Sequence, residues 1–241
     1  METEQLYQED AYLREFYAEV TEVDQQQNAV MLERTAFYPG GGGQPADRGF
    51  FHFGGVSSEV TKIIRDSGRI WHVLDGELPE VGQKIQGKVD WDRRYRLMRT
   101  HTAMHILCGV IWRDYQAQVT GGNMEPLSGR MDFEFENMNA GLVKEIEEKI
   151  NREVDAARDV EVNILPREKA NRIPDLIRTK INLLPANLNE IRIVNIHGLD
   201  LQADGGTHVK NTREVGPISI TDYKSKGKIN KRLKIELQPQ V

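Results

Sequence analysis

The sequence predicts an α+β protein: a small N-terminal β-barrel over residues 1–89, then an α+β domain over residues 90–241 with an antiparallel sheet and helices. Two observations support this prediction. Short runs of alternating apolar and polar residues, separated by turn residues, fill the first part of the chain, as is typical of a small barrel. Near residue 90 the apolar period changes from two residues to 3.6, which indicates the start of a long helix.

Composition limits the class of protein. The 241 residues are 39% hydrophobic and 29% charged, as in ordinary globular domains. The net charge of −5 argues against a generally basic nucleic-acid-binding surface, although a local basic face remains possible. A single cysteine excludes an internal disulfide, and the polar start resembles no targeting signal. We therefore expect a cytoplasmic protein without membrane contact, DNA binding or an obligate protein partner.

The barrel strands are expected where alternation is clearest, and turns such as Asp75-Gly76 separate them. The expected strands cover residues 15–23, 29–33, 50–53, 56–64, 70–73 and 84–89. Four consecutive glycines, residues 40–43, stand between Pro39 and Pro45. Such a run cannot form the interior of a helix or strand, and it leaves the backbone free for positive φ angles and for close approach by another molecule. A plain surface turn is the alternative.

The second domain is expected to begin with a helix over residues 92–115, which carries an apolar stripe and a neighbouring histidine stripe. A glycine-containing loop over residues 119–126, a strand over 128–136 and a second helix from an Asn139 cap to about residue 158 should follow. The remaining expected elements are a strand over 161–165, short helices over 167–179 broken at Pro174, a strand over 191–196, a loop over 201–209, and a hairpin of residues 218–223 and 232–237.

The first chemical signal is the pair His101 and His105, four residues apart on the first helix of this domain. That spacing places both imidazoles on one helix face, as two ligands of one metal ion require. Taken alone, the pair is explained slightly better by buried, hydrogen-bonded histidines. No glutamate follows His101, so the general-base arrangement of helix-borne zinc peptidases is absent.

A second signal lies far downstream, where Asp204 precedes His208 by four residues across Gly205 and Gly206. Paired glycines allow a sharp turn, so both side chains can point at one ion approached from the helix. Together with His101 and His105 they would form a mixed nitrogen and oxygen site that suits zinc. The alternative is a tight turn with an exposed histidine.

The motifs RTHTAMHIL and GGTHVKNT resemble the editing domain shared by alanyl- and threonyl-tRNA synthetases, and FYPGGGGQPADRG narrows the resemblance to the alanyl branch. The resemblance covers nearly the whole chain, including IPDLIRTKINLLP, and is closest to free-standing AlaX editing proteins of medium length. It implies hydrolysis of the ester that joins serine, or in some members glycine, to tRNA for alanine. It also implies one Zn²⁺ per chain.

The resemblance carries the catalytic and metal-ligand roles over to His101, His105 and His208. The family often has cysteine where this chain has Asp204, so the fourth ligand is either Asp204 or a water molecule. Cys108 lies seven residues from His101, too far along the helix to complete the site, and we interpret it as a packed core thiol. The predicted substrate-binding residues are Gln44, Gly41, Gly42, Gly43, Thr120, Gly205 and Gly206, with Thr120 as the partner of the seryl hydroxyl.

Two basic clusters are candidates for phosphate contact with tRNA. The first contains Arg93, Arg94, Arg96 and Arg99, and the second contains Lys224, Lys226, Lys228, Lys231, Arg232 and Lys234. Solvated faces are the alternative in both cases. The overall hypothesis is a zinc-dependent deacylase of mischarged tRNA. Its rivals are a non-catalytic tRNA-binding module with a structural metal and a small-molecule metallohydrolase.

Overall fold

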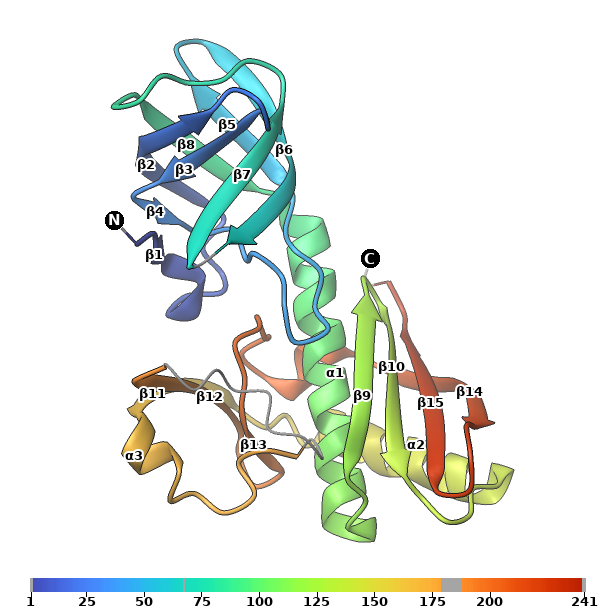
Figure 1. Ribbon diagram of the computed structural model, residues 1–241. Helices are drawn as coiled ribbons and strands as arrows, with labels where there is room; N and C mark the ends of the chain where they lie inside the picture. The colour runs from blue at the N-terminus through green and yellow to red at the C-terminus, as the bar shows by residue number, and fades with distance from the viewer. Residues whose placement is uncertain (1, 67, 179–187, 240–241) are drawn as a thin grey trace. The chain divides into compact units, whose positions relative to one another are not determined.

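The computed structural model describes residues 2–66, 68–178 and 188–239 (Figure 1). The chain divides into two compact units, Met1–Tyr95 and Arg96–Val241. The division falls inside helix α1 (Trp91–Tyr115), so this helix begins in the first unit and continues into the second. The sequence-based boundary lies at residues 89 and 90, where the last barrel strand ends.

The first unit is a closed barrel with the strand order β2-β3-β7-β6-β5-β8. Its strands are β2 (Glu15–Asp24), β3 (Ala29–Leu32), β5 (Gly49–Phe53), β6 (Val56–Asp66), β7 (Arg69–Asp75) and β8 (Lys84–Val89). Closure comes from β2 and β8, which pair antiparallel from Glu15 and Lys88 onward. Outside the barrel sheet, β1 (Glu4–Gln5) pairs in parallel with β4 (Arg34–Thr35), next to the 3-10 turn η1 (Leu6–Gln8). The predicted barrel is confirmed.

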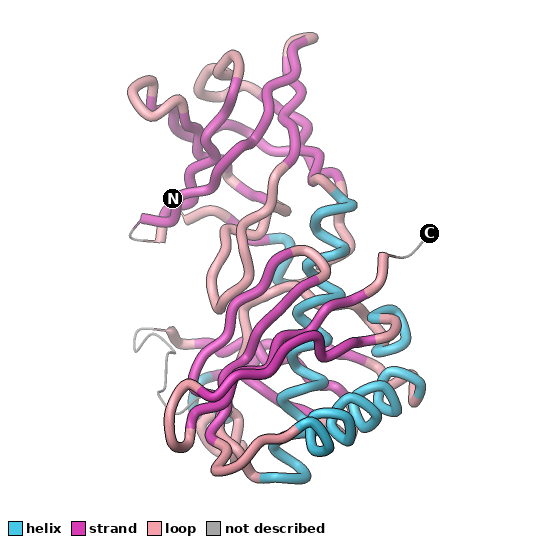
Figure 2. The backbone as a smooth tube through the Cα atoms, turned by 90° about the vertical axis from the view of Figure 1, so that its right-hand side faces the viewer, coloured by secondary structure: helices cyan, strands magenta, loops and turns pink. Residues whose placement is uncertain are grey.

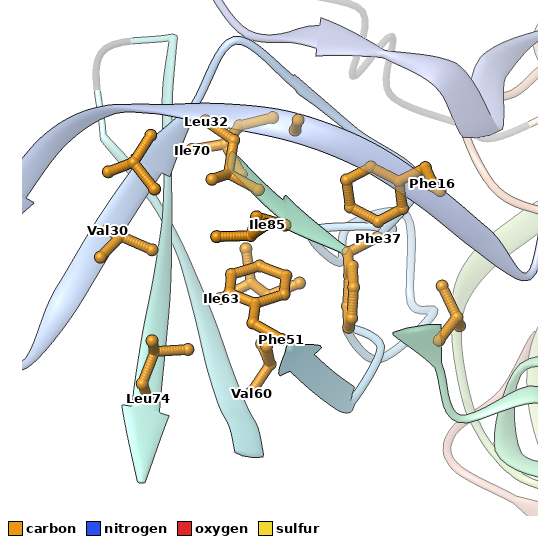
Figure 3. Close-up of a cluster of buried hydrophobic side chains, with 14 of the residues drawn as sticks. Phe16, Val30, Leu32, Phe37, Phe51, Val60, Ile63, Ile70, Leu74 and Ile85 are labelled. Atoms are coloured by element: carbon orange, nitrogen blue, oxygen red, sulfur yellow. The ribbon is translucent and has the colours of Figure 1, made fainter. Parts of the chain in front are cut away.

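Alternation along the strands fills the barrel with apolar side chains, as Figure 3 shows. Phe37 meets both Phe16 and Phe51 edge to face. A Cβ atom at Gly87 would lie 2.3 Å from the Phe16 ring, so only glycine fits below that ring. His72 is also inside and lies 2.9 Å from the Thr35 hydroxyl. Burial lowers the pKa of His72 to about 4, so this core contains a neutral imidazole.

The second unit contains two antiparallel sheets, which agrees with the predicted α+β class. One sheet has the order β14-β15-β10-β9 and the other has the order β11-β12-β13. Their strands are β9 (Val119–Glu125), β10 (Ser128–Glu134), β11 (Val160–Pro166), β12 (Glu190–Ile196), β13 (Asp200–Ala203), β14 (Ile218–Ser225) and β15 (Asn230–Leu237). The other elements are α2 (Ala140–Asp155), α3 (Arg167–Ala170) and the 3-10 turn η2 (Thr212–Val215).

Helix α1 lies beside both sheets of this unit (Figure 1). Every residue from 97 to 111 is buried. A Cβ atom at Gly122 of β9 would lie 3.2 Å from Met104 of the helix. On the other side, a Cβ atom at Gly109 would lie 2.9 Å from the Leu199 side chain, just before β13. Helix α2 runs along the four-stranded sheet (Figure 2), and its Asn151 amide donates to the carbonyl of Ile218 in β14. The predicted Asn139 cap accepts from the Leu142 amide at 3.0 Å.

Two predicted loops are partly strands. Residues 119–125 form β9 because the backbone pairs with β10, despite Gly121 and Gly122. Residues 200–203 form β13, which pairs with β12 in the register Ile193 opposite Ala203. Both strands are stabilised by a neighbouring strand rather than by their own composition. Of the short helices predicted over residues 167–179, the described residues up to 178 form one, α3. Residues 179–185, which belong to the IPDLIRTKINLLP segment, lie outside the described part. No helix among the described residues is long and apolar enough to cross a membrane.

Candidate metal centre

The structure brings the four predicted ligands together. His101 and His105 come from α1, and Asp204 and His208 come from the segment after β13. Each offers one ligand atom, and these atoms all lie within 4.8 Å of one another. The three histidines are buried, whereas the Asp204 side chain is 13% exposed. Residues 107 positions apart in sequence thus form one compact cluster inside the second unit.

The turn after β13 is fixed from two sides. The Asp204 amide donates to the Arg192 carbonyl at 3.1 Å, and the Arg192 guanidinium donates to the Asp204 carbonyl at 2.9 Å. Asp204 Oδ2 then accepts from the Gly206 amide at 2.7 Å, which closes a local turn. These bonds hold the carboxylate beside two imidazoles, with His208 Nε2 at 3.0 Å and His101 Nε2 at 3.6 Å.

His105 and His208 each have a partner on the ring nitrogen that faces away from the cluster. His105 Nδ1 lies 3.0 Å from Asp200 Oδ2, and His208 Nδ1 lies 3.1 Å from Thr102 Oγ1. Both partners are buried. Metal-binding histidines commonly have such partners, which set the ring orientation. Asp200 and Thr102 are not among the predicted site residues, although each stands close in sequence to a predicted ligand.

The electrostatics favour cation binding. Burial lowers the pKa of His101 well below its usual value and that of His208 to about 4, so both rings keep free lone pairs at neutral pH. Burial also opposes the charged form of His105, but the hydrogen bond to Asp200 and the negative charges of Asp200 and Asp204 together outweigh burial, so the pKa of His105 is raised. Burial alone would raise the pKa of Asp204, yet the adjacent His101 and His208 bring it well below its usual value. The cluster therefore offers a carboxylate among imidazoles.

This donor set fits zinc. Zn²⁺ accepts imidazole nitrogen and carboxylate oxygen at about 2.0–2.2 Å, and four donors around one centre match its tetrahedral preference. Three imidazole nitrogens suit Mg²⁺ and Ca²⁺ poorly, because these ions prefer sites made of oxygen ligands alone. Cys108 is buried with its sulfur 3.4 Å from the Gln202 amide, and burial raises the pKa of this thiol well above its usual value. It therefore behaves as the packed thiol that the sequence predicts.

The remaining predicted substrate-binding residues are spread more widely. Thr120 lies in β9 with an exposed side chain whose hydroxyl donates to Asn230 Oδ1 of β15 at 3.2 Å. Gly205 follows Asp204 directly, and a Cβ atom there would meet nothing within 4 Å. Gly205 has no left-handed φ angle, in contrast to the glycine run of the barrel unit. Neither backbone conformation nor packing requires glycine at position 205.

The glycine run lies in the first unit, between β4 and β5. Gly40, Gly41, Gly42 and Gly43 have φ angles of 88°, 136°, 56° and 88°, a conformation that L side chains rarely adopt. Gly41 and Gly42 are exposed, whereas Gln44 is only 2% exposed. The base of the loop is fixed by Asp47, which accepts from the Tyr38 amide. The backbone of Gly41 and Gly42 is therefore accessible to another molecule, whereas the Gln44 side chain is not.

The predicted RNA-contacting residues differ in their exposure: some are buried and others can reach solvent. Arg94 is completely buried, because Asp47 and the carbonyls of Ala11 and Ala36 bind its guanidinium. Arg99 is buried as well, and Val215 and Gln238 carbonyls accept from it. Lys231 is buried and donates to the carbonyls of Gly227 and Lys228, both at 2.9 Å. These three side chains stabilise the fold and cannot contact phosphate as they stand. Arg93 and Arg96 are half-buried, and Lys226 and Lys228 are exposed.

Comparison with known families gives two matches. Residues 191–234 match the threonyl and alanyl tRNA synthetase second additional domain, which includes Asp204 and His208. Residues 5–93 match the class II (A) tRNA synthetases, which includes the glycine run.

Comparison with individual proteins gives two AlaX-M relatives that align over nearly their full length and one longer ligase. The chain is 40% identical to an alanyl-tRNA editing protein AlaX-M of Saccharolobus solfataricus over 243 residues, which cover 98% of this chain and all of the relative. It is 37% identical to an AlaX-M protein of Methanosarcina barkeri, covering 96% of this chain and 97% of that protein. An alanine–tRNA ligase of Pyrobaculum neutrophilum is 38% identical, but only 25% of its length is covered.

Proposed function

Because this chain belongs to the AlaX-M family of alanyl-tRNA editing proteins, we propose that it hydrolyses the ester of mischarged tRNA for alanine in the cytoplasm. Seryl-tRNA is the proposed main substrate and glycyl-tRNA a second one. The observation that carries the proposal is the buried cluster of His101, His105, Asp204 and His208. Mixed nitrogen and oxygen donors around one point are the arrangement of a hydrolytic zinc centre.

In this proposal His101, His105 and His208 hold one zinc ion, with Asp204 or a water molecule in the fourth position. Bound zinc would supply a Lewis acid for the ester carbonyl or lower the pKa of a water molecule. The protein contributes a site whose three histidines are buried, which limits access of bulk water. The open space beside Gly205 would admit the aminoacyl end.

Selectivity for serine over alanine needs a polar partner for the extra hydroxyl group, because alanine would leave that partner unpaired. Thr120 is our candidate. Its hydroxyl currently donates to Asn230, so it would exchange that bond for one with the seryl hydroxyl. The exchange is feasible because the Thr120 side chain is exposed and its present partner is a neutral amide oxygen.

For tRNA contact we propose Arg93, Arg96, Lys226 and Lys228, which keep partial or full exposure. Phosphate contact by such side chains predicts affinity that falls as salt rises. The amides of Gly41, Gly42 and Gly43 are proposed to approach the acceptor end, since no side chain obstructs them. Arg94, Lys231 and Gln44 are omitted because they are buried.

The test is deacylation of Ser-, Gly- and Ala-tRNA for alanine, with chelator and after zinc is restored. We expect loss of ester hydrolysis with chelator and recovery with zinc for the first two substrates. His105→Ala should lose both zinc and activity, whereas His197→Ala, a matched change at an exposed histidine, should retain both. An unchanged ester half-life with zinc-loaded protein would favour the alternative, a tRNA-binding module with a structural metal. Turnover of simple esters without tRNA would favour a small-molecule hydrolase.

A further inference from the structure

We propose that Asp200 is a positioning residue that holds His105 with a proton on Nδ1 and the Nε2 lone pair facing the metal, and that Arg178 balances the Asp200 charge. The inference rests on the proposed function, because it assumes that the four-residue cluster binds zinc. It adds a residue that touches neither zinc nor substrate and acts only through His105.

The contact between Asp200 and His105 is well defined. Asp200 begins β13, and its side chain is completely buried. Oδ2 lies 3.0 Å from His105 Nδ1 and also accepts from Gln202 Nε2 at 2.6 Å. Because an ionised carboxylate can only accept hydrogen bonds, the ring nitrogen that faces it must carry the proton. The other nitrogen, Nε2, then has the lone pair that a metal ion needs.

A buried carboxylate of this kind needs a compensating cation. Arg178 supplies one, with Nε 3.8 Å from Asp200 Oδ1. The Arg178 side chain is only 10% exposed, and its guanidinium lies over the Trp112 ring of α1 with the central carbon 4.7 Å from the ring centre. Asp200 Oδ1 and Arg178 Nε have no hydrogen-bond partner among the described residues, so charge attraction is the interaction that links them.

The other paired histidine has a less restrictive partner. His208 Nδ1 faces the Thr102 hydroxyl, which can donate or accept. The Val209 amide already donates to Thr102 Oγ1 at 3.2 Å, so that hydroxyl is oriented without any charge. Of these two partners, Asp200 is the anionic one. An anionic partner both fixes the ring and makes the imidazole a stronger donor to a metal.

The first experiment needs no variant. Long-range ¹H–¹⁵N NMR of the metal-free protein at neutral pH identifies which nitrogen of a neutral histidine carries the proton, and a charged ring has protons on both. We expect a protonated Nδ1 in His105, hydrogen-bonded to Asp200. In Asp200→Asn the amide can donate as well as accept, so the population with a protonated Nε2 and a bare Nδ1 should increase. A wild-type His105 with a bare Nδ1 would overturn the proposal.

The second experiment measures zinc affinity by competition with a chromophoric chelator. Asp200→Asn should bind zinc about 10- to 100-fold more weakly. Asp132→Asn is the matched control, because Asp132 is also buried and pairs with an arginine, Arg232, at 2.6 Å. It should leave zinc affinity unchanged. Unchanged affinity in Asp200→Asn overturns the role of Asp200 alone, whereas a wild-type protein that binds no zinc overturns the metal centre as well.

Discussion

At the scale of single residues, we expect Asp204 to influence how strongly the proposed centre binds its metal. Its carboxylate is a harder ligand than a thiolate, which zinc binds more firmly. We therefore expect Asp204→Cys to raise zinc affinity roughly tenfold, about 1.4 kcal/mol, and Asp204→Ala to lower it. Chelator competition measures both changes. The control is Asp222→Cys, at a half-buried position on β14, which should leave zinc affinity unchanged. Equal zinc affinity in Asp204→Cys and wild type would contradict the role of Asp204 as a ligand.

Gly205 lies next to that ligand and has room for a side chain. Since a Cβ atom at position 205 would contact nothing within 4 Å and the φ angle is not left-handed, Gly205→Ala should leave the melting temperature and zinc content unchanged. If the space admits the aminoacyl end, the same change should raise KM for seryl-tRNA several-fold. Gly121→Ala is a suitable control, because a Cβ atom there also meets nothing within 4 Å. An unaltered KM for Gly205→Ala would show that the space is not used.

His72 in the barrel core gives a pH dependence of stability. Its pKa is lowered to about 4 in the folded protein, so between pH 6.5 and 4 the unfolded chain takes up a proton that the folded chain does not. The contribution of His72 to the free energy of unfolding is therefore fully present above pH 6.5. It falls by at most about 3 kcal/mol as the pH decreases toward 4. Urea unfolding at several pH values should show a shallower decline for His72→Phe than for wild type, and parallel curves would contradict this assignment.

These residues also show what the sequence can and cannot predict. The helix spacing and the short turn suggested His101, His105, Asp204 and His208 as a set, the resemblance supplied the histidine roles, and the structure brings the four side chains together. Asp200 and Thr102 were missed because their role depends on β13 and α1 meeting in space, which no local spacing expresses. Arg94 shows the opposite error. A basic run suggests an exposed face, but this arginine is buried against an aspartate 47 residues away.

At the scale of elements, close approach of α1 to the start of β13 links the two parts of the proposed site. Alanine is normally better than glycine in a helix by about 1 kcal/mol. At Gly109 the sign should reverse, because a Cβ atom would lie 3.0 Å from Asp200 Cβ and 3.1 Å from the Leu199 carbonyl. We expect Gly109→Ala to lower the melting temperature and to weaken zinc binding, since Asp200 would shift away from His105. A more stable variant with unchanged zinc affinity would contradict this packing argument.

Element predictions succeeded where the chain carries its own periodic signal and failed where a partner supplies the stability. The barrel strands and the two long helices have clear apolar periods, and each was found close to its observed bounds. β9 and β13 have no such period. At Gly122 of β9, a Cβ atom would lie 3.2 Å from Met104 of α1, and pairing with β10 determines the conformation of the strand.

At the scale of the whole molecule, the proposed metal ligands lie in one of the two units. The barrel unit has its own apolar core around Phe37 and Phe51, and none of the four proposed ligands belongs to it. All four ligands belong to the second unit, where they join α1 to the turn after β13. A ligand that binds only the folded form stabilises the part of the protein that contains its site.

Zinc should therefore protect the second unit selectively. At a free zinc concentration 100 times the dissociation constant, the expected gain is about 2.7 kcal/mol. Hydrogen exchange measured by mass spectrometry should show slower exchange in α1 beyond Tyr95, in β12 and in β13, because these elements hold or support the ligands. Strands β2 to β8 should exchange at the same rate with and without zinc. His105→Ala should lose the protection and His197→Ala should keep it. Equal protection of both units would mean that they unfold as one cooperative body, whereas no protection anywhere would contradict the proposed centre itself.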